Sequence, residues 1–370
     1  MLQRIYIIAA EASADLHGSN LVRAINQLNP EIKWKGWGGS KLLSEGLEID
    51  IRYESANFMG FVEVIKNLPK IFNYFKITKK SILEFKPDLL LLIDYPGFNL
   101  RMAEWAKKNN IPVYYYIAPQ VWAWKESRVY KIKACVRKLF VILPFEKEYF
   151  NSFGINTFYF GHPLMKFIND FRVDNNFRTQ YQLSNKSIIA LLPGSRVQEI
   201  KTMLPVFLKA LTKECKHQIV IAGLTQHEHL YKQICEEFPL KTTIVYNCTY
   251  DLLSNSRMAL VTSGTATLET ALFKVPQIVC YKGNKISYHI ARFLIKIKFI
   301  SLVNLIMDRK IVCELIQDDF NETNIRNELS KLTSSSHRSE MISSYHELHG
   351  KLFQINSSEL IAKEILKDFS

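Results

Sequence analysis

The sequence predicts an α/β protein with two Rossmann-like domains that face an interdomain cleft, followed by a helical C-terminal tail. Short apolar runs typical of strands alternate with longer amphipathic stretches typical of helices up to about residue 165. A polar, asparagine-rich stretch over 166–186 interrupts this alternation, which starts again at Ile188. Two successive alternations of this kind indicate two doubly wound parallel sheets. The expected parts are an N-terminal domain over 1–165, a C-terminal domain over 166–340 and a tail over 341–370.

Each expected strand is a run of aliphatic or aromatic residues that ends at a turn former or a polar residue. The N-terminal domain is expected to have strands at Ile5–Ala9, Lys33–Gly39, Leu89–Ile93, Val113–Ile117, Leu139–Leu143 and Phe158–Phe160, and an extended stretch after Leu47. The C-terminal domain is expected to have strands at Ile188–Leu192, Gln218–Ala222, Thr243–Tyr246, Met258–Val261 and Gln277–Tyr281. From about Ile286 onward we expect mostly helix.

Asp94 is the first candidate for acid–base chemistry. It follows Leu89–Ile93, an unbroken aliphatic run that predicts a central strand buried on both faces. A Pro96-Gly97 turn comes almost directly after it, and ligands of open α/β sheets bind beyond the carboxyl ends of the strands. The alternative is that Asp94 only caps the next helix or turn.

The best phosphate-binding candidate follows the expected strand Met258–Val261 and opens a helix. Hydroxyl groups and unpaired N–H groups at a helix N-terminus suit a diphosphate. Glu269, one turn into the helix, could accept hydrogen bonds from two adjacent ribose hydroxyls. An ordinary capped helix is the alternative. The loop residues are Ser263, Gly264, Thr265, Ala266 and Thr267.

Arg196 lies in the equivalent turn after the first strand of the C-terminal domain, Pro193-Gly194-Ser195-Arg196. Its guanidinium could bind a diphosphate leaving group, although a surface arginine near a helix start is the alternative. Together, Asp94 and Arg196 indicate a group transfer in which Asp94 deprotonates an acceptor hydroxyl and a nucleoside diphosphate leaves. The chain has no Asp-x-Asp motif, so no metal held by that motif is expected.

The net charge of +13 is compatible with nucleic acid, an anionic membrane or an anionic substrate. The basic residues are spread along the chain and no nucleic-acid-binding motif is present, so we expect no nucleic acid partner. No apolar run reaches the ~20 residues that a membrane-spanning helix needs.

An aromatic and basic segment over 58–76 could contact an anionic membrane or acyl chains. The alternative is a helix that packs on its own sheet and exposes its lysines to water. The apolar residues proposed for this contact are Phe58, Met59, Phe61, Val62, Ile65 and Phe72.

Six short motifs, taken together and in this order, resemble those of the lipid-A-disaccharide synthases. The resemblance runs from residue 5 to beyond 315. The motifs are Glu11-Ala12-Ser13-Ala14-Asp15, Ile93-Asp94-Tyr95-Pro96-Gly97-Phe98-Asn99, Pro119-Gln120-Val121-Trp122-Ala123-Trp124, Gly161-His162-Pro163, Leu191-Leu192-Pro193-Gly194-Ser195-Arg196 and Ser263-Gly264-Thr265-Ala266-Thr267-Leu268-Glu269. The chain departs from the usual pattern at Ala10 and Ala14, where the family usually has glycine.

The resemblance implies an inverting glycosyltransferase with the GT-B fold and no cofactor or metal. It would join UDP-2,3-diacylglucosamine to 2,3-diacylglucosamine 1-phosphate, forming a β(1→6)-linked disaccharide and UDP. It also implies a peripheral position on the cytoplasmic face of the inner membrane. A homodimer with exchanged C-terminal segments is a further implication, so that the tail would pack on its own or a partner's N-terminal domain.

The resemblance also implies roles for individual residues. Asp94 matches the proposed general base and Arg196 the essential arginine, with Ser195 beside it. Glu11 and Ser13 match a loop near the acceptor. The residues expected near the nucleotide are Asn304, Arg309 and Glu314.

Two other readings of the sequence stay open. Another UDP-sugar transferase or a UDP-sugar epimerase would share the 263–269 loop but would need no acyl-chain groove. A basic module that binds nucleic acid or a membrane without chemistry would show a steep salt dependence and no effect of Asp94→Ala on turnover.

Overall fold

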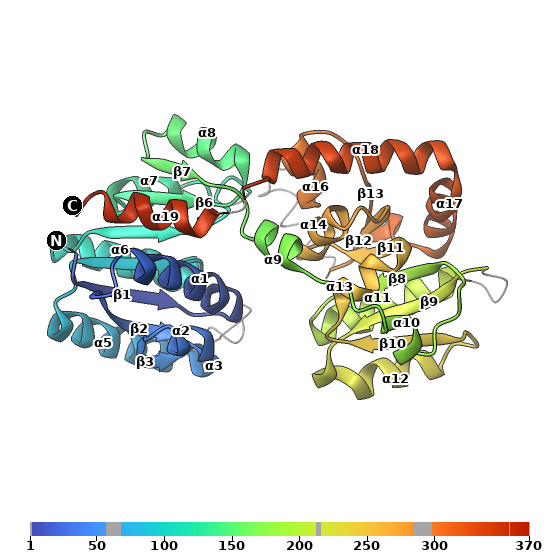
Figure 1. Cartoon of the computed structure of the whole chain (residues 1–370), viewed down its shortest axis with the longest axis horizontal. Coiled ribbons are helices and arrows are strands. Elements are labelled where there is room, and N and C mark those ends of the chain that lie inside the picture. Colours follow the sequence, from blue (N-terminus) through green and yellow to red (C-terminus); the bar gives the residue numbers. More distant parts are fainter. Residues whose placement is uncertain are drawn as a thin grey trace. The chain divides into compact units, whose positions relative to one another are not determined.

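The computed structural model describes residues 2–56, 68–123, 125–211, 216–283, 298–354 and 356–369. The chain forms two compact units (Figure 1). Unit 1 consists of residues 1–166 together with 354–370, and unit 2 consists of residues 167–353.

Unit 1 is built on a parallel sheet with the strand order β3-β2-β1-β4-β5-β6-β7. Its central strand β4 is fully buried, as its unbroken aliphatic sequence predicts. The order reverses direction between β1 and β4, which is the topological switch point of a doubly wound fold. The strands are β1 (Arg4–Ala9), β2 (Lys33–Gly38), β3 (Glu48–Arg52), β4 (Leu89–Ile93), β5 (Val113–Tyr116), β6 (Lys138–Val141) and β7 (Thr157–Tyr159).

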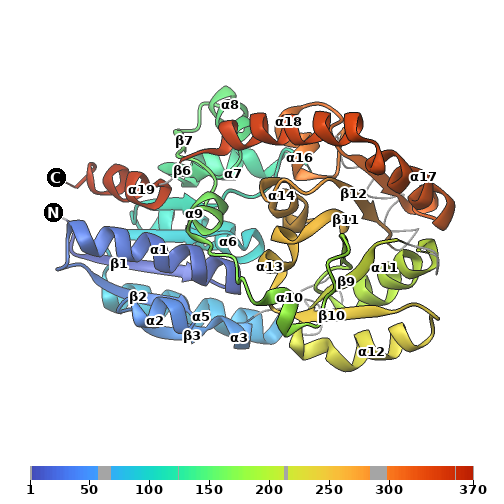
Figure 2. The same ribbon diagram turned by 45° about the vertical axis from the view of Figure 1, so that its right-hand side comes forward.

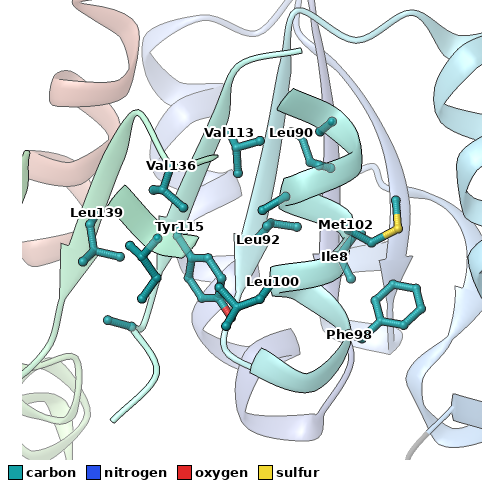
Figure 3. Packing of buried hydrophobic residues seen from close by; sticks show 14 of the residues in the cluster. Ile8, Leu90, Leu92, Phe98, Leu100, Met102, Val113, Tyr115, Val136 and Leu139 are labelled. Carbon is teal, nitrogen blue, oxygen red and sulfur yellow. The ribbon is translucent and has the colours of Figure 1, made fainter. Parts of the chain in front are cut away.

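Helices cover both faces of the unit 1 sheet. Apolar residues of α5, α6 and α7 form a core with one face, which includes Leu92, Tyr115 and Leu100 (Figure 3). Apolar residues of α1, α2 and α19 form a second core with the other face. The helices are α1 (Ala12–Leu28), α2 (Ser40–Ser44), α3 (Tyr53–Ala56), α5 (Leu68–Phe85), α6 (Pro96–Lys108), α7 (Arg128–Cys135), α8 (Pro144–Ser152), α9 (Leu164–Asp170) and α19 (Ser357–Leu366).

The C-terminal segment divides at residue 354 rather than forming one tail from residue 341. Residues up to Leu352 complete a long helix of unit 2, whereas α19 lies beside α1 in unit 1 (Figures 1 and 2). The two helices bury their apolar residues in different cores. Tyr345 and Leu348 are buried in unit 2, whereas Ile361 and Ile365 are buried in the core of unit 1.

Unit 2 contains a second parallel sheet, with the order β10-β9-β8-β11-β12-β13 and the switch point between β8 and β11. The expected strands are present, and two parallel sheets with helices confirm the predicted fold class. β13 was not predicted: it lies at the edge of the sheet, in the region expected to be helical. The strands are β8 (Ile188–Leu192), β9 (Gln218–Gly223), β10 (Thr242–Tyr246), β11 (Ser256–Thr262), β12 (Gln277–Tyr281) and β13 (Cys313–Ile316).

The helices of unit 2 bury an apolar face of α11 beside α12 and α17, where Phe207 meets Phe320. Gln277 of β12 donates a hydrogen bond to Tyr345 and so joins the sheet to α18. The helices are α10 (Phe177–Gln180), α11 (Val197–Ala210), α12 (Glu228–Glu236), α13 (Thr249–Ser254), α14 (Thr265–Leu272), α16 (Leu302–Met307), α17 (Glu322–Thr333) and α18 (Ser335–Leu352), with 3₁₀ turns η1 (Thr225–His227) and η2 (Gln317–Asp319).

Candidate active site

A pocket of about 480 Å³ opens in unit 2 at the carboxyl ends of β8 and β11. This is the switch point of the sheet, where doubly wound folds bind nucleotides. The pocket brings together the two loops that the sequence analysis selected independently. The predicted residues that line it are Ser195, Arg196, Ser263, Gly264, Thr265, Ala266 and Glu269.

The loop before α14 is held by its own side chains. The Ser263 hydroxyl donates a hydrogen bond of 3.0 Å to the carbonyl of Ile300, and the buried Thr267 hydroxyl donates one of 2.8 Å to the carbonyl of Gly264. Thr267 does not line the pocket. Exposed Thr265 and the first N–H groups of α14 therefore remain as the anion-binding part of this loop.

Glu269 reaches the pocket from the second turn of α14. The Tyr250 hydroxyl donates a hydrogen bond of 2.8 Å to Glu269 Oε1. Burial raises the pKa of the Glu269 carboxyl, while this hydrogen bond opposes the rise. Tyr250 thus orients one carboxylate oxygen and stabilises its ionised form, which suits the acceptor of ribose hydroxyl protons.

Glu199 organises the turn that carries Arg196. Its Oε2 atom accepts hydrogen bonds from the N–H groups of Ser195, at 3.1 Å, and Arg196, at 3.2 Å. Its Oε1 atom lies 3.5 Å from the Arg196 guanidinium, whose side chain is 68% exposed. Gly194 has φ of +102°, and a Cβ there would lie 2.5 Å from Glu199 Oε2, so the turn requires glycine. Arg196 is thus held at the rim of the pocket with its guanidinium accessible.

The pocket also contains residues that the sequence analysis missed, among them Glu199, Thr249 and Thr262. Thr262 is buried, and its hydroxyl has no hydrogen-bond partner within the described part of the chain. A buried hydroxyl without a protein partner in a pocket indicates that a ligand or a water molecule supplies its hydrogen bond. Its position as the last residue of a buried strand was the signal that could have found it.

Asn304 and Glu314, expected near the nucleotide, form a hydrogen-bonded hub in the segment that precedes and includes β13. Asn304 accepts from the N–H groups of Ile311 and Val312 and donates to Glu314 at 2.8 Å. Glu314 also accepts from the N–H groups of Ile300 and Ser301. Arg309 pairs with Glu347 of α18 at 2.5 Å. None of the three predicted residues lines the pocket, so in this structure they shape the segment next to it.

The second candidate region lies at the switch point of unit 1. β1 and β4 pair in register, with Ala9 opposite Ile93, so Glu11 and Asp94 both follow the carboxyl edge of the sheet. Glu11 is the N-cap residue of α1, and Ser13 is exposed in the first turn. Asp15, in the first turn of α1, accepts hydrogen bonds from the N–H groups of Gly39, Lys41 and Leu42 at the start of α2.

Asp94 is held in a strained conformation. Asp94 and Tyr95 both have φ of +49°, a left-handed region that costs on the order of 1–3 kcal/mol for a residue other than glycine. Asp94 Oδ1 accepts a hydrogen bond of 2.8 Å from the Tyr95 N–H. No hydrogen bond from another described residue reaches Oδ2. Burial raises the pKa of the carboxyl, which makes Asp94 a stronger base than an exposed aspartate.

Most of the aromatic and basic segment, with Phe58, Met59, Phe61, Val62 and Ile65, lies outside the described residues, whereas Phe72 lies on α5. The Phe72 side chain is 64% exposed, and Leu68 is exposed on the same helix. Among the described residues, no helix has the length and apolar character needed to cross a membrane. In the same part of the chain, no cluster of His, Cys, Asp and Glu could hold a metal ion.

The match to a known family decides the identity of the chain. A family model described as lipid-A-disaccharide synthetase matches residues 5–365. The chain belongs to this family. The lipid-A-disaccharide synthase of Syntrophus aciditrophicus is 39% identical over 345 residues, which cover 91% of this chain and 90% of that protein. That of Myxococcus xanthus is 32% identical over 372 residues, covering 98% and 97%.

As a lipid-A-disaccharide synthase family member, the chain is an enzyme, a glycosyltransferase of lipid A biosynthesis. Solved structures agree with the fold. A UDP-N-acetylglucosamine 2-epimerase from Listeria monocytogenes, described as putative in its own report, matches with a TM-score of 0.66 at 11% sequence identity, covering 100% of this chain and 96% of that one. At this identity the likeness concerns the fold alone, and it supports the GT-B assignment.

Proposed function

We propose that this family member joins UDP-2,3-diacylglucosamine to 2,3-diacylglucosamine 1-phosphate. The products would be the β(1→6)-linked lipid A disaccharide 1-phosphate and UDP. The observation that carries the proposal is the family match from residue 5 to 365, together with relatives named lipid-A-disaccharide synthase across nearly the whole chain.

In the proposed reaction the 6-hydroxyl oxygen of the acceptor attacks the anomeric carbon of the donor from the face opposite UDP. The Asp94 carboxylate takes the hydroxyl proton, the new C–O bond forms, and the bond between the anomeric carbon and the diphosphate oxygen breaks with its electron pair on UDP. A single displacement inverts the anomeric configuration. The raised pKa of Asp94 supports its role as the base.

Unit 2 would take the UDP part of the donor. The start of α14 and Arg196 would hold the diphosphate and stabilise the negative charge that develops as it leaves. Glu269, oriented by Tyr250, would accept hydrogen bonds from the ribose, and Thr262 would contact the nucleotide from the floor of the pocket. We assign Asn304, Arg309 and Glu314 an indirect role, through the shape of the segment beside the Ser263 loop.

The acceptor would bind at the carboxyl edge of unit 1, near Glu11, Ser13 and Asp94. We further propose a peripheral attachment to the anionic cytoplasmic face of the inner membrane, in which exposed Phe72 takes part. A homodimer that exchanges its C-terminal segments remains part of the proposal.

The test is an assay of UDP release by the purified protein with UDP-2,3-diacylglucosamine and 2,3-diacylglucosamine 1-phosphate. Wild type is expected to release UDP and form one disaccharide, whose β anomeric configuration is read by NMR. Asp94→Ala and Arg196→Ala are each expected to lower turnover strongly. Epimerisation of a water-soluble UDP-sugar without an acceptor, or transfer to a water-soluble acceptor alone, would instead favour the alternative reaction on the same fold.

A further inference from the structure

At the end of β4, the carbonyl groups of Ile93 and Asp94 accept hydrogen bonds from side chains. The N–H of Asp94 still bonds to the carbonyl of Tyr116 in β5, at 3.0 Å. The left-handed conformations of Asp94 and Tyr95 then turn the chain into α6. Ile93 is fully buried and Asp94 is half-buried, so hydrogen-bond donors at their carbonyls stabilise this turn.

Two buried side chains supply those donors. The Tyr115 hydroxyl, from the neighbouring strand β5, donates a hydrogen bond of 2.5 Å to the carbonyl of Asp94. Asn99 Nδ2, from the first turns of α6, donates to the same carbonyl at 2.7 Å and to the carbonyl of Ile93 at 3.2 Å. The Asp94 peptide is thus tied to β5 on one side and to α6 on the other.

Burying these polar groups costs free energy, which indicates that the arrangement does more than fill space in the core. Asn99 is fully buried, yet its Oδ1 atom has no hydrogen-bond partner among the described residues. Tyr115 lies in the apolar core under α6, beside Leu92 and Leu100 (Figure 3), where an apolar side chain would fit the surroundings. Both polar side chains converge on one carbonyl, that of a residue held in a strained conformation.

We propose that Tyr115 and Asn99 are positioning residues that fix the main chain of Asp94, so that Asp94 Oδ2 keeps one direction toward the acceptor hydroxyl. Neither side chain touches substrate in this proposal. It rests on the proposed function, since it takes Asp94 as the base. A general base takes a proton efficiently only when it lies within hydrogen-bond distance of the hydroxyl. A main chain that cannot rotate keeps the carboxylate at that distance.

Tyr115→Phe removes the hydroxyl and keeps the ring, so it isolates the hydrogen bond. Tyr116→Phe is the matched control: it lies next in the same strand, is equally buried, and its hydroxyl has no hydrogen-bond partner in the described chain. Asn99→Ala removes the second donor, and Asn109→Ala, at the exposed end of the same helix, is its control. Folding of every variant is checked by urea unfolding.

Two measurements decide the proposal. Hydrogen exchange of the peptide covering 89–99 is expected to speed up in Tyr115→Phe and Asn99→Ala but not in the controls. Turnover is expected to fall about tenfold or more in both variants with KM changed less than about threefold, because misplacing a catalytic group by ~1 Å can cost two orders of magnitude. In an Asp94→Ala background, Tyr115→Phe is expected to lower turnover no further.

If hydrogen exchange of the 89–99 peptide stayed unchanged in both variants, Tyr115 and Asn99 would not hold the main chain of Asp94, whatever the effect on turnover. Faster exchange with unchanged turnover would overturn the positioning role, and so would an equal loss of turnover with and without Asp94. If Asp94→Ala itself kept full turnover, the proposed base would fail, and the exchange data would still decide whether Tyr115 and Asn99 hold this segment.

Discussion

The Tyr250 hydroxyl and Glu269 Oε1 lie 2.8 Å apart and share a hydrogen bond at the edge of the unit 2 pocket. The bond joins α13 to α14, and of these two helices only α14 contains residues of a motif selected from the sequence. It lowers the pKa of a carboxyl group whose pKa burial raises, and so favours the ionised form of Glu269. The candidate nucleotide pocket therefore depends on a residue outside the 263–269 loop.

Tyr250→Phe is expected to weaken UDP binding about threefold to tenfold at pH 7, which corresponds to the net contribution of one ordinary hydrogen bond. Losing the donor raises the pKa of Glu269 further, so the ionised fraction at a given pH falls. UDP affinity in the variant should therefore drop at a higher pH than in wild type. Calorimetry between pH 5.5 and about 8 measures this shift. Tyr246→Phe, whose hydroxyl has no partner in the described chain, is the control; matching pH curves in all three proteins would contradict the role of Tyr250.

Arg196→Ala is expected to lower kcat by about 10²–10³, the usual loss when one group that stabilises transition-state charge is removed. Folding stability should hardly change, because the exposed contact of Arg196 with Glu199 belongs to a class worth ~0–1 kcal/mol. Arg196→Lys should recover only part of the activity, since lysine lacks the planar pair of donors. Lys201→Ala, an exposed cation on the same helix, controls for a general loss of charge. An equal loss in that control would remove Arg196 from the mechanism.

Glu146 predicts a pH dependence of stability in unit 1. Burial raises the pKa of this carboxyl to about 7, from an ordinary value of 4.5, although it accepts hydrogen bonds from Trp122 Nε1 and the N–H groups of Ile142 and Leu143. The folded state therefore holds the proton more tightly than the unfolded state. Its contribution to stability is fully present below pH ~4.5 and is lost as pH rises to about 7, by roughly 2–3 kcal/mol.

Urea unfolding followed by tryptophan fluorescence tests this slope, because every tryptophan of the chain lies within residues 1–166. Glu146→Gln should remove this contribution between pH 4.5 and about 7, whereas Glu148→Gln, at an exposed position of the same helix, should leave it. The prediction fails if both variants keep the wild-type slope.

Lys138 anchors the C-terminal helix. Its side chain is 5% exposed and its Nζ lies 2.6 Å from Glu364 Oε1 and 2.7 Å from Asp368 Oδ1. Tyr114 donates a further hydrogen bond to Asp368. Lys138→Ala is expected to destabilise unit 1 by about 1.5–3 kcal/mol, because it removes a buried cation that hydrogen-bonds the half-buried carboxylates of Glu364 and Asp368. Arg137→Ala, which removes an exposed partner of Asp368 at 3.3 Å, should cost ~0–1 kcal/mol. Proteolysis between unit 2 and α19 should become faster in Lys138→Ala alone; equal rates in both variants would contradict the anchor.

Phe72→Ser is expected to reduce co-sedimentation with vesicles that contain anionic lipids, since it removes an exposed aromatic ring beside the lysines of α5. Val173→Ser, an exposed apolar position in unit 2, is the control. Adding Phe61→Ser and Ile65→Ser should deepen the loss if the whole segment takes part. Wild-type binding by the triple variant would reject this surface as the membrane contact.

Sequence patterns predicted the parallel strands well, because buried strands of α/β sheets are continuous apolar runs, such as Leu89–Ile93 in β4. β13 was missed since its short sequence, Cys-Glu-Leu-Ile, includes a charged residue and lies half-buried at the edge of the sheet. The tail boundary was placed too early because helical spacing does not reveal which core a helix joins. The role of Asp15 could not be predicted, because its hydrogen bonds reach the start of α2, far along the chain.

The sequence by itself determined the two-sheet fold, the loops that follow β4, β8 and β11, and the family. These follow from local order, because hydrophobic runs, turn residues and short motifs are read along the chain. Only the tertiary structure decided which of those residues line the unit 2 pocket, that Asn304 and Glu314 bond within their own segment, and that Tyr115 and Asn99 meet at the carbonyl of Asp94. These contacts join residues that are distant in sequence. They depend on strand order and helix packing, which local sequence patterns do not predict.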